Sequence, residues 1–150
     1  MMLLKAICTP AVICCGPATS VQAAASLMRL KHTGDLVVVD DPEEDRIPLG
    51  VITDRDIVVE VLANGLNPAT TAVRSLLRTP IVIAHEDEDA SEALERMRTH
   101  GIRRLPIVGS EGKLAGVITL DDILKLVAAD INALVEIVGR ERDLEQRLRR

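Results

Sequence analysis

Gly50-Val51-Ile52-Thr53-Asp54-Arg55-Asp56-Ile57 is repeated later in the chain as Gly116-Val117-Ile118-Thr119-Leu120-Asp121-Asp122-Ile123. In each copy a run of β-branched residues is followed directly by Thr-x-x-Asp. Because Thr is a favoured helix N-cap, this order is typical of a strand that runs straight into the first turn of a helix. The sequence therefore predicts the same strand-to-helix junction in both halves of the chain.

The repeat extends upstream of this stretch. Matching apolar residues recur at a constant spacing: Leu36 with Leu105, Met28 with Met97, and Ala24 with Ala93. The spacing changes by three residues between these pairs and the two junctions. The change falls in the polar stretch 40–48, which matches 109–113, and a hairpin loop tolerates a change of length. Two copies of one unit therefore make up most of the chain.

Each copy is predicted to contain a strand, a helix, a hairpin of two strands and a second helix. In the first copy these elements are the strand Ala11–Cys15, a helix behind Thr19-Ser20, the hairpin strands Leu36–Val39 and Leu49–Thr53, and the helix Asp54–Leu62. In the second copy they are the strand Ile81–Ala84, a helix behind Asp89, the strands Leu105–Val108 and Leu114–Thr119, and the helix Asp121–Ala129. Gln22 and Glu92 are placed to complete capping boxes. The predicted fold class is α/β (α+β), with two β-α-β-β-α units.

The first helix of each copy carries an i, i+3, i+4, i+7 stripe that we expect to face the core: Val21, Ala24, Ala25 and Met28, then Ala90, Ala93, Leu94 and Met97. We expect residues 7–66 and 81–130 to form the two units, 67–80 to link them, and 131–150 to form a helical extension. In the link, a short helical piece is predicted at Val73–Leu77. In the extension, an apolar stripe that ends at Gly139 is expected to pack on the module or on a twin subunit: Ile131, Leu134, Val135 and Val138.

The composition, 47% hydrophobic and 27% charged, is that of a globular protein. The chain has no Phe, Trp or Tyr, so no aromatic ring can stack on a nucleobase, and its net charge of −5 does not attract nucleic acid or an anionic membrane. The Arg-rich residues 140–150 also carry acids and are interpreted as a solvated helix.

Three cysteines near the start, Cys8, Cys14 and Cys15, make no disulfide framework and favour a reducing, cytoplasmic compartment. The opening apolar segment could pass for a secretory signal. It is not interpreted as one, because Lys5 follows the first leucines and Pro10 interrupts the run.

The repeated junction has the chemistry of a nucleotide site. A helix N-terminus offers free N–H groups to a phosphate, and the Thr hydroxyl adds a hydrogen bond. The two oxygens of the Asp suit the paired hydroxyls of a ribose. The alternative is that Thr and Asp only cap the helix. Because the pattern occurs twice in a full-length repeat, we favour the site.

The element order and the repeated G-V-I-T-x-x-D pattern resemble the cystathionine-β-synthase (CBS) domain, over about residues 7–130. A tandem pair resembles a Bateman module, and LANGLNPATTAV (62–73) resembles the linker of small bacterial proteins made of this pair alone. The resemblance implies two units packed through their sheets with pseudo-twofold symmetry, and two clefts between them. In the family these clefts bind AMP, ADP, ATP, S-adenosylmethionine or related ligands. It also implies a regulatory module without catalytic activity.

The resemblance assigns the first strand to adenine, basic residues before the next strand to phosphate, and Thr and Asp of the motif to phosphate and ribose. The second copy is expected to supply the more complete site: Ile81, Val82, Ile83, Ala84, Arg103, Arg104, Pro106, Ile118, Thr119 and Asp122. The first copy supplies Ile13, Cys14, Thr53, Arg55 and Asp56. Gly34 and Asp35 stand there where the second copy has Arg103 and Arg104, so we expect the first cleft to be weaker or empty.

Two other functions remain open. One is a structural dimerisation module with empty clefts. The other is a protein named after inosine monophosphate dehydrogenase but lacking its catalytic barrel, which needs about 250 residues. A metal site of Cys14 and Cys15 with His32, His85 or His100 is disfavoured, because adjacent cysteines on a strand point to opposite faces. The expected partners are an adenosine nucleotide or S-adenosylmethionine, a second subunit and an unidentified regulated protein, with no nucleic acid, membrane, metal or catalytic cofactor.

Overall fold

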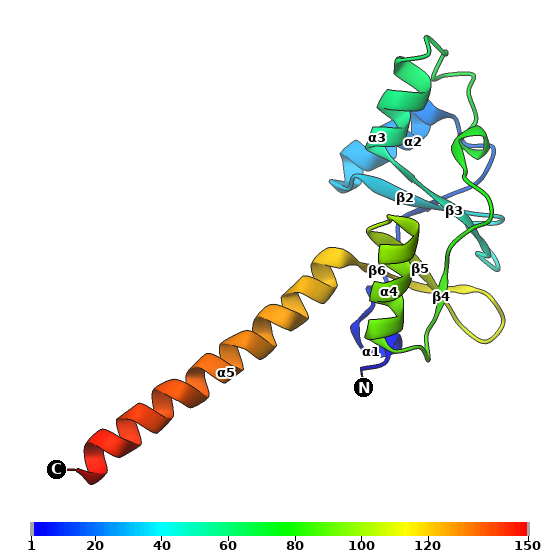
Figure 1. Cartoon of the computed structure of the whole chain (residues 1–150). Helices are drawn as coiled ribbons and strands as arrows, with labels where there is room; N and C mark the ends of the chain where they lie inside the picture. The colour runs from blue at the N-terminus through cyan, green and yellow to red at the C-terminus, as the bar shows by residue number, and fades with distance from the viewer. Residues whose placement is uncertain (1, 150) are drawn as a thin grey trace.

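Each half of the chain forms a three-stranded sheet in the computed structural model, which describes residues 2–149 (Figure 1). The first sheet has the order β1 (Cys14–Cys15), β2 (Asp35–Val39) and β3 (Pro48–Thr53). The second has the order β4 (Ala84–His85), β5 (Arg104–Val108) and β6 (Leu114–Thr119). In both sheets the first pair of strands is parallel and the second pair is antiparallel. The predicted α/β fold of two repeated units is confirmed.

The helices follow the predicted order except for the first, Leu4–Ile7, which was not predicted. They are α1 (Leu4–Ile7), α2 (Val21–Lys31), α3 (Asp54–Asp56), α4 (Ala90–His100) and α5 (Leu120–Leu148). Three departures are notable. The predicted helix Asp54–Leu62 changes to a π-helix over Ile57–Leu62, and the short piece in the link is a 3₁₀-helix, Val73–Leu76. The helix predicted to end at Ala129 instead continues through Gly139 to Leu148.

The first strand of each unit is shorter than predicted. Only Cys14–Cys15 and Ala84–His85 pair with a neighbouring strand. Before Cys14 the chain is turned, because the Val12 N–H donates to the Pro10 carbonyl (3.0 Å). Before Ala84 the Ile83 carbonyl accepts from Arg96 Nη1 (2.6 Å) instead of from a strand. These bonds replace ladder pairing at Val12 and Ile83, whereas the Ile13 carbonyl still accepts from the Val37 N–H (3.1 Å).

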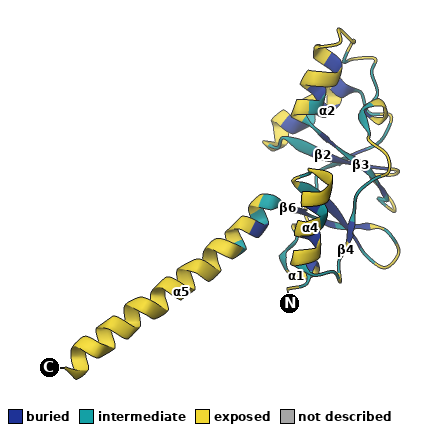
Figure 2. Cartoon of the chain, viewed as in Figure 1, coloured by how far each residue is buried: buried dark blue, intermediate teal, exposed yellow. Residues whose placement is uncertain are grey.

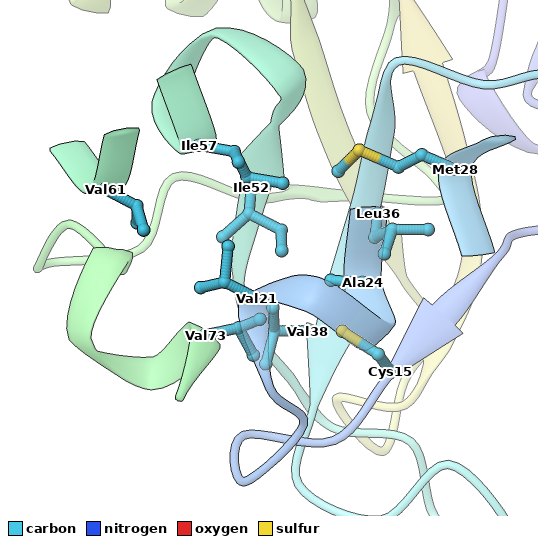
Figure 3. Close-up of a cluster of buried hydrophobic side chains, with 10 residues drawn as sticks. All are labelled: Cys15, Val21, Ala24, Met28, Leu36, Val38, Ile52, Ile57, Val61 and Val73. Atoms are coloured by element: carbon cyan, nitrogen blue, oxygen red, sulfur yellow. The ribbon is translucent and has the colours of Figure 1, made fainter. Parts of the chain in front are cut away.

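The first unit buries one face of its sheet against α2, the π-helix and the 3₁₀-helix (Figure 3). In that core lie Val21, Ala24 and Met28 from α2, Leu36, Val38 and Ile52 from the sheet, and Val61 and Val73. The prediction that Ala25 and Leu94 also face the core is wrong, since both are exposed. A sheet covers only a narrow strip of each helix, so the i+4 position falls outside it.

The caps of the first helices differ between the units. Asp89 and Glu92 form the predicted capping box at the start of α4. Ser20 caps α2 by accepting from the Ala23 N–H (3.1 Å). The box predicted with Gln22 is wrong, because Ala23 occupies the third helical position, the one whose side chain would complete it.

The two sheets meet through Val37, Val39 and Leu114, which form a core between the units. In addition, the segment that precedes the first strand of each unit, here called its leading segment, packs on the other unit. Leu3 bridges to Asp89 and Thr9 to Val117, while Ser20 bridges to Ala72, which begins the corresponding segment before the second unit. Leu4 is fully buried in the core of the second unit.

Helix α5 leaves the body soon after it begins (Figure 1). Ile123 is its buried residue, and every residue from 127 to 149 is exposed (Figure 2). Among the described residues, no helix is long and apolar enough to cross a membrane.

Candidate functional site

A cavity of about 380 Å³ lies where the two units meet. Its walls come from the β3–α3 junction, from the segment between the units and from the loop before β5. Its apolar lining residues include Val51, Leu76, Ile81, Val82 and Ile102. Thr53 and several charged side chains line it as well. A volume of this size lies within the range of small-molecule sites.

Thr53 and Asp56 join the end of β3 to the start of α3 by reciprocal hydrogen bonds. The Asp56 N–H donates to Thr53 Oγ1 (3.1 Å), and the Thr53 N–H donates to Asp56 Oδ2 (2.9 Å). The capping role is therefore real. It leaves the second oxygen of Asp56 and the Thr53 hydroxyl proton with hydrogen-bonding capacity in the cavity.

Four arginines line the same cavity: Arg55, Arg78, Arg103 and Arg104. Two carboxylates, Asp54 and Asp56, line it as well, so the lining has two more arginines than carboxylates, and two of the arginines also contact Asp35 and Asp121 outside the lining. Arg78 Nη2 lies 3.9 Å from Asp56 Oδ1, and no ion pair of Arg55 occurs among the described residues. Such a group of guanidinium groups suits an anionic ligand.

Arg104 also joins the two units. Its Nε lies 3.0 Å from Asp35 Oδ1, and these residues begin β5 and β2, the corresponding strands of the two repeats. The alignment is poor, however, since the buried Arg104 Nε makes no hydrogen bond of good geometry. A buried N–H of this kind is rarely left unsatisfied, so Arg104 Nε can still donate a hydrogen bond to a better placed acceptor.

The Thr119–Asp122 junction has less free hydrogen-bonding capacity and a smaller cavity beside it. Thr119 Oγ1 both accepts from the Asp122 N–H (3.2 Å) and donates to Asp122 Oδ2 (2.9 Å), so its hydroxyl proton is already used. The cavity beside it measures about 110 Å³ and is lined by Arg103, Arg104, Thr119, Leu120 and Asp121. Arg103 Nη2 lies 3.5 Å from Asp121 Oδ1 there. This cavity is too small for a nucleoside.

The structure divides the residues that the sequence grouped together. Eight of them line one or both cavities: Thr53, Arg55, Asp56, Ile81, Val82, Arg103 and Arg104 on the larger, with the two arginines and Thr119 on the smaller. Seven line neither cavity: Ile13, Cys14, Ile83, Ala84, Pro106, Ile118 and Asp122. Ala84 and Ile118 are fully buried in the core of the second unit.

Arg104 lies opposite Thr119 in the sheet, as the repeat implies, but its side chain and that of Arg103 also reach the Thr53 cavity. Sequence reasoning missed this cross-assignment, and with it Arg78, Leu76 and Ile102. Because each leading segment packs on the opposite unit, the residues just before Ile81 belong beside Thr53. The crossing of the segments was the missing information.

No group of three or more His, Cys, Asp and Glu side chains that could hold a metal ion occurs within residues 2–149. His32, His85 and His100 are exposed. Burial raises the pKa of the Cys15 thiol to about 11 and also raises the pKa of Cys14. Both thiols are therefore protonated near neutral pH.

Comparison with known proteins agrees with this architecture. The model of the CBS domain matches the chain twice, over residues 4–63 and 73–129. The chain belongs to the CBS domain family. Its CBS pair is 38% identical over 115 residues to the uncharacterized protein MK0525 of Methanopyrus kandleri, with 77% of the chain and 57% of that protein covered. The chain thus spans little more than half the length of this relative.

Other relatives place the CBS pair in different settings. Hypoxic response protein 1 of Mycobacterium tuberculosis is 36% identical over 125 residues, which cover 83% of the chain and 85% of that protein. Inosine-5'-monophosphate dehydrogenase of Methanocaldococcus jannaschii is 38% identical over 114 residues, but these cover 76% of the chain and 21% of the enzyme. The similarity is thus confined to a fifth of that enzyme.

Solved structures show the same pair of units. Hypoxic response protein I, described with two coordinated zinc ions, has a TM-score of 0.73 at 31% identity, covering 83% of this chain and 98% of that one. The CBS domain pair of MJ0100, in complex with 5'-methylthioadenosine and S-adenosyl-L-methionine, has a TM-score of 0.75 at 25% identity and covers 87% and 98%. A hexameric CBS-CP12 protein from bloom-forming cyanobacteria has a TM-score of 0.70 at 28% identity and covers 83% and 70%.

Proposed function

We propose that this CBS pair is a regulatory module without catalytic activity that binds an adenosine nucleotide in the Thr53–Asp56 cavity. One observation carries the proposal: four arginines, the Thr53 hydroxyl and the Asp56 carboxylate line one cavity that also has apolar lining residues. The arginines suit a phosphate, the Thr53 hydroxyl and the Asp56 carboxylate suit a ribose, and the apolar residues suit a base. The adenosyl ligands of the MJ0100 pair are consistent with this ligand class.

The charges favour phosphate-bearing ligands over S-adenosylmethionine. The guanidinium groups of Arg55, Arg78 and Arg103 stabilise an anion, whereas the sulfonium group of S-adenosylmethionine is a cation. Asp56 Oδ1 accepts from a ribose hydroxyl in this arrangement, and its contact with Arg78 is long enough (3.9 Å) to give way. AMP, ADP or ATP is therefore the proposed ligand, with S-adenosylmethionine weaker.

The proposal reverses the expected ranking of the two clefts. The sequence favoured Thr119 and Asp122 because both arginines belong to their repeat. The larger cavity, with all four arginines, lies instead at Thr53 and Asp56. We propose this cavity as the main site and the smaller one at Thr119 as weak or empty.

Isothermal titration calorimetry with AMP, ADP, ATP, S-adenosylmethionine and adenosine tests the site. Asp56→Ala is expected to weaken all five ligands, because they share the ribose. One lost hydrogen bond to a charged group corresponds to about 1.5–3 kcal/mol, or a tenfold to hundredfold higher Kd. Arg103→Ala is expected to weaken the nucleotides while adenosine binding stays unchanged.

Asp122→Ala is the matched control, since it removes the same capping box from the other repeat. If Asp122→Ala loses binding while Asp56→Ala keeps it, the main site lies at the Thr119–Asp122 junction and the proposal is wrong. If none of the five ligands binds the unaltered protein, the CBS pair is a structural module instead.

We further propose that the protein acts in the cytoplasm as a homodimer and reports ligand occupancy to a regulated protein. Its three cysteines are free thiols, which suits a reducing compartment. The similar CBS-CP12 protein is hexameric, which supports self-association of such pairs.

A further inference from the structure

The outer part of α5 is an exposed helix with a large apolar content. From Val127 to Leu148 no residue is covered by the body of the protein, as Figure 2 shows. Leu134 and Val135 are 63% and 64% exposed. A soluble monomer rarely leaves aliphatic side chains gathered in this way, so another surface is expected to cover them.

The spacing of the apolar residues identifies that surface as a helix. Leu124, Val127, Ile131, Leu134 and Val138 follow one another at intervals of three and four residues. This is the a/d pattern of a heptad repeat, which forms a narrow seam along one side of a helix. A helix that lies on a membrane has a broader apolar face and a basic polar face. Between Leu120 and Leu148, however, seven side chains are acidic and four are basic, so an anionic membrane is disfavoured.

A second copy of α5 fits the seam in one orientation. In a parallel, in-register pair, the heptad would place Glu141 against Glu141 and Glu145 against Glu145 at seam positions, where like charges repel. In an antiparallel pair with Ile131 opposite Leu134 of the partner subunit, Val127 lies opposite Val138 of the partner subunit. All four seam contacts around the centre are then apolar, and the next contact outward sets Leu124 opposite Glu141 of the partner subunit, without two like charges in contact.

The charges beside the seam agree with the antiparallel register. In the same alignment, Asp121 near the start of one helix lies beside Arg142 of the partner subunit, and its exposed contact with Arg103 of its own chain is 3.5 Å long. The parallel register offers no such pair, because its flanking positions set Asp130 beside Val135 and Ile137 beside Arg142. Complementary charge therefore favours a second, antiparallel copy of this chain over an unrelated helix.

We infer that α5 is a self-association element that pairs with α5 of a second subunit in antiparallel orientation, with Ile131 and Leu134 at the centre. This surface is distinct from the Thr53 cavity and does not depend on the proposed ligand. It also gives the exposed extension a structural role that the two CBS units do not need for their own cores.

Disulfide cross-linking of the full chain tests the orientation. Cys8 and Cys14 are replaced by Ser, and the buried Cys15 is retained. One sample carries Val127→Cys and a second, differently tagged sample carries Val138→Cys. After mixing and mild oxidation, a disulfide between the two tagged chains is expected, with little between two Val127→Cys chains. Asn132→Cys, on the far side of the helix from the seam, is the matched control and is expected to give little product.

A second readout uses Ile131→Asp with Leu134→Asp, since neither side chain touches the body. Added to the mixed cysteine samples, this double change is expected to reduce the Val127–Val138 product at least tenfold. Asn132→Asp with Ala133→Asp is its control and should leave the product unchanged. Preferential cross-linking of Val127→Cys with itself would show parallel pairing and overturn the inference. Absence of any product above the Asn132→Cys level would overturn it as well.

Discussion

At the scale of single residues, Gly50 and Gly116 explain why the repeated stretch begins with glycine. Each lies where the crossing segment of the chain passes over a strand. A Cβ built on Gly50 would lie 2.7 Å from the Leu77 side chain, and one on Gly116 would lie 2.8 Å from Cys8 Sγ and 2.9 Å from the Thr9 carbonyl. The absence of a side chain allows both close approaches, which hold the crossing segments against the sheets.

The two glycines are expected to differ when changed to alanine. Gly116→Ala meets a backbone carbonyl that cannot turn away, so a loss of about 1–3 kcal/mol in unfolding free energy is expected. Gly50→Ala meets the end of a flexible leucine side chain, and a loss of less than about 1 kcal/mol is expected. Urea denaturation of both variants beside the unaltered protein measures the difference. An equal or larger loss for Gly50→Ala would contradict this explanation.

At the scale of elements, the start of α4 is also the anchor of the N-terminal segment. Asp89 accepts hydrogen bonds from the Ser91 hydroxyl (2.6 Å), the Ser91 N–H (2.9 Å) and the Met2 N–H (2.6 Å). The Ser91 bonds are the main reason that the pKa of Asp89 falls from 3.8 to about 2. One carboxylate therefore stabilises both a helix and a contact between distant parts of the chain.

This depressed pKa predicts a pH dependence of stability. The carboxylate is favoured in the folded state, so its contribution is complete above the unfolded pKa near 4 and disappears as the pH falls toward 2. Asp89→Asn is expected to lower the Tm at pH 6 and to flatten the decline of Tm between pH 4 and pH 2. Thermal melts followed by circular dichroism measure this. The exposed Asp143→Asn is the control, and an unaltered acid decline in Asp89→Asn would refute the prediction.

The helices and strands also show which parts of the fold could be predicted from the sequence. The hairpins and the Thr–Asp junctions were predictable, because β-branched runs and N-caps act over a few residues. The end of the last helix was not, because Gly139 only weakens a helix and the next residues continue it. The types of residue that line the site could be predicted, but not which of them come together in one cavity. Arg103 and Arg104 lie beside Thr53 only because two leading segments cross between the units, and no local pattern encodes that crossing.

At the scale of the whole molecule, the two units share their cores. Leu4 is buried in the second unit, Val73 closes the core of the first, and Val37 packs with Leu114 between the sheets. Neither half of the sequence therefore contains all of the residues that bury its sheet. The module should unfold as one cooperative body.

Cutting the chain in the link tests this. Residues 1–68 expressed alone lack Val73 and the partner of Val37, so the fragment is expected to show no cooperative thermal transition. Adding residues 69–150 should restore one, as measured by circular dichroism. A fragment 1–68 that is monomeric, stable and cooperative by itself would show that the units fold independently.

The crossing of the leading segments also imposes an order on biosynthesis. The Glu88 carbonyl that accepts from the Leu4 N–H is made 84 residues after Leu4, and the Val117 partner of Thr9 is made later still. At about 5–20 residues per second, Thr9 must wait roughly 5–20 s for that partner. The segment with Leu4 and Thr9 leaves the ribosome before its partners, so it reaches its final place only after they are made. During this delay the apolar side chains of this segment remain exposed, and chaperones can bind them.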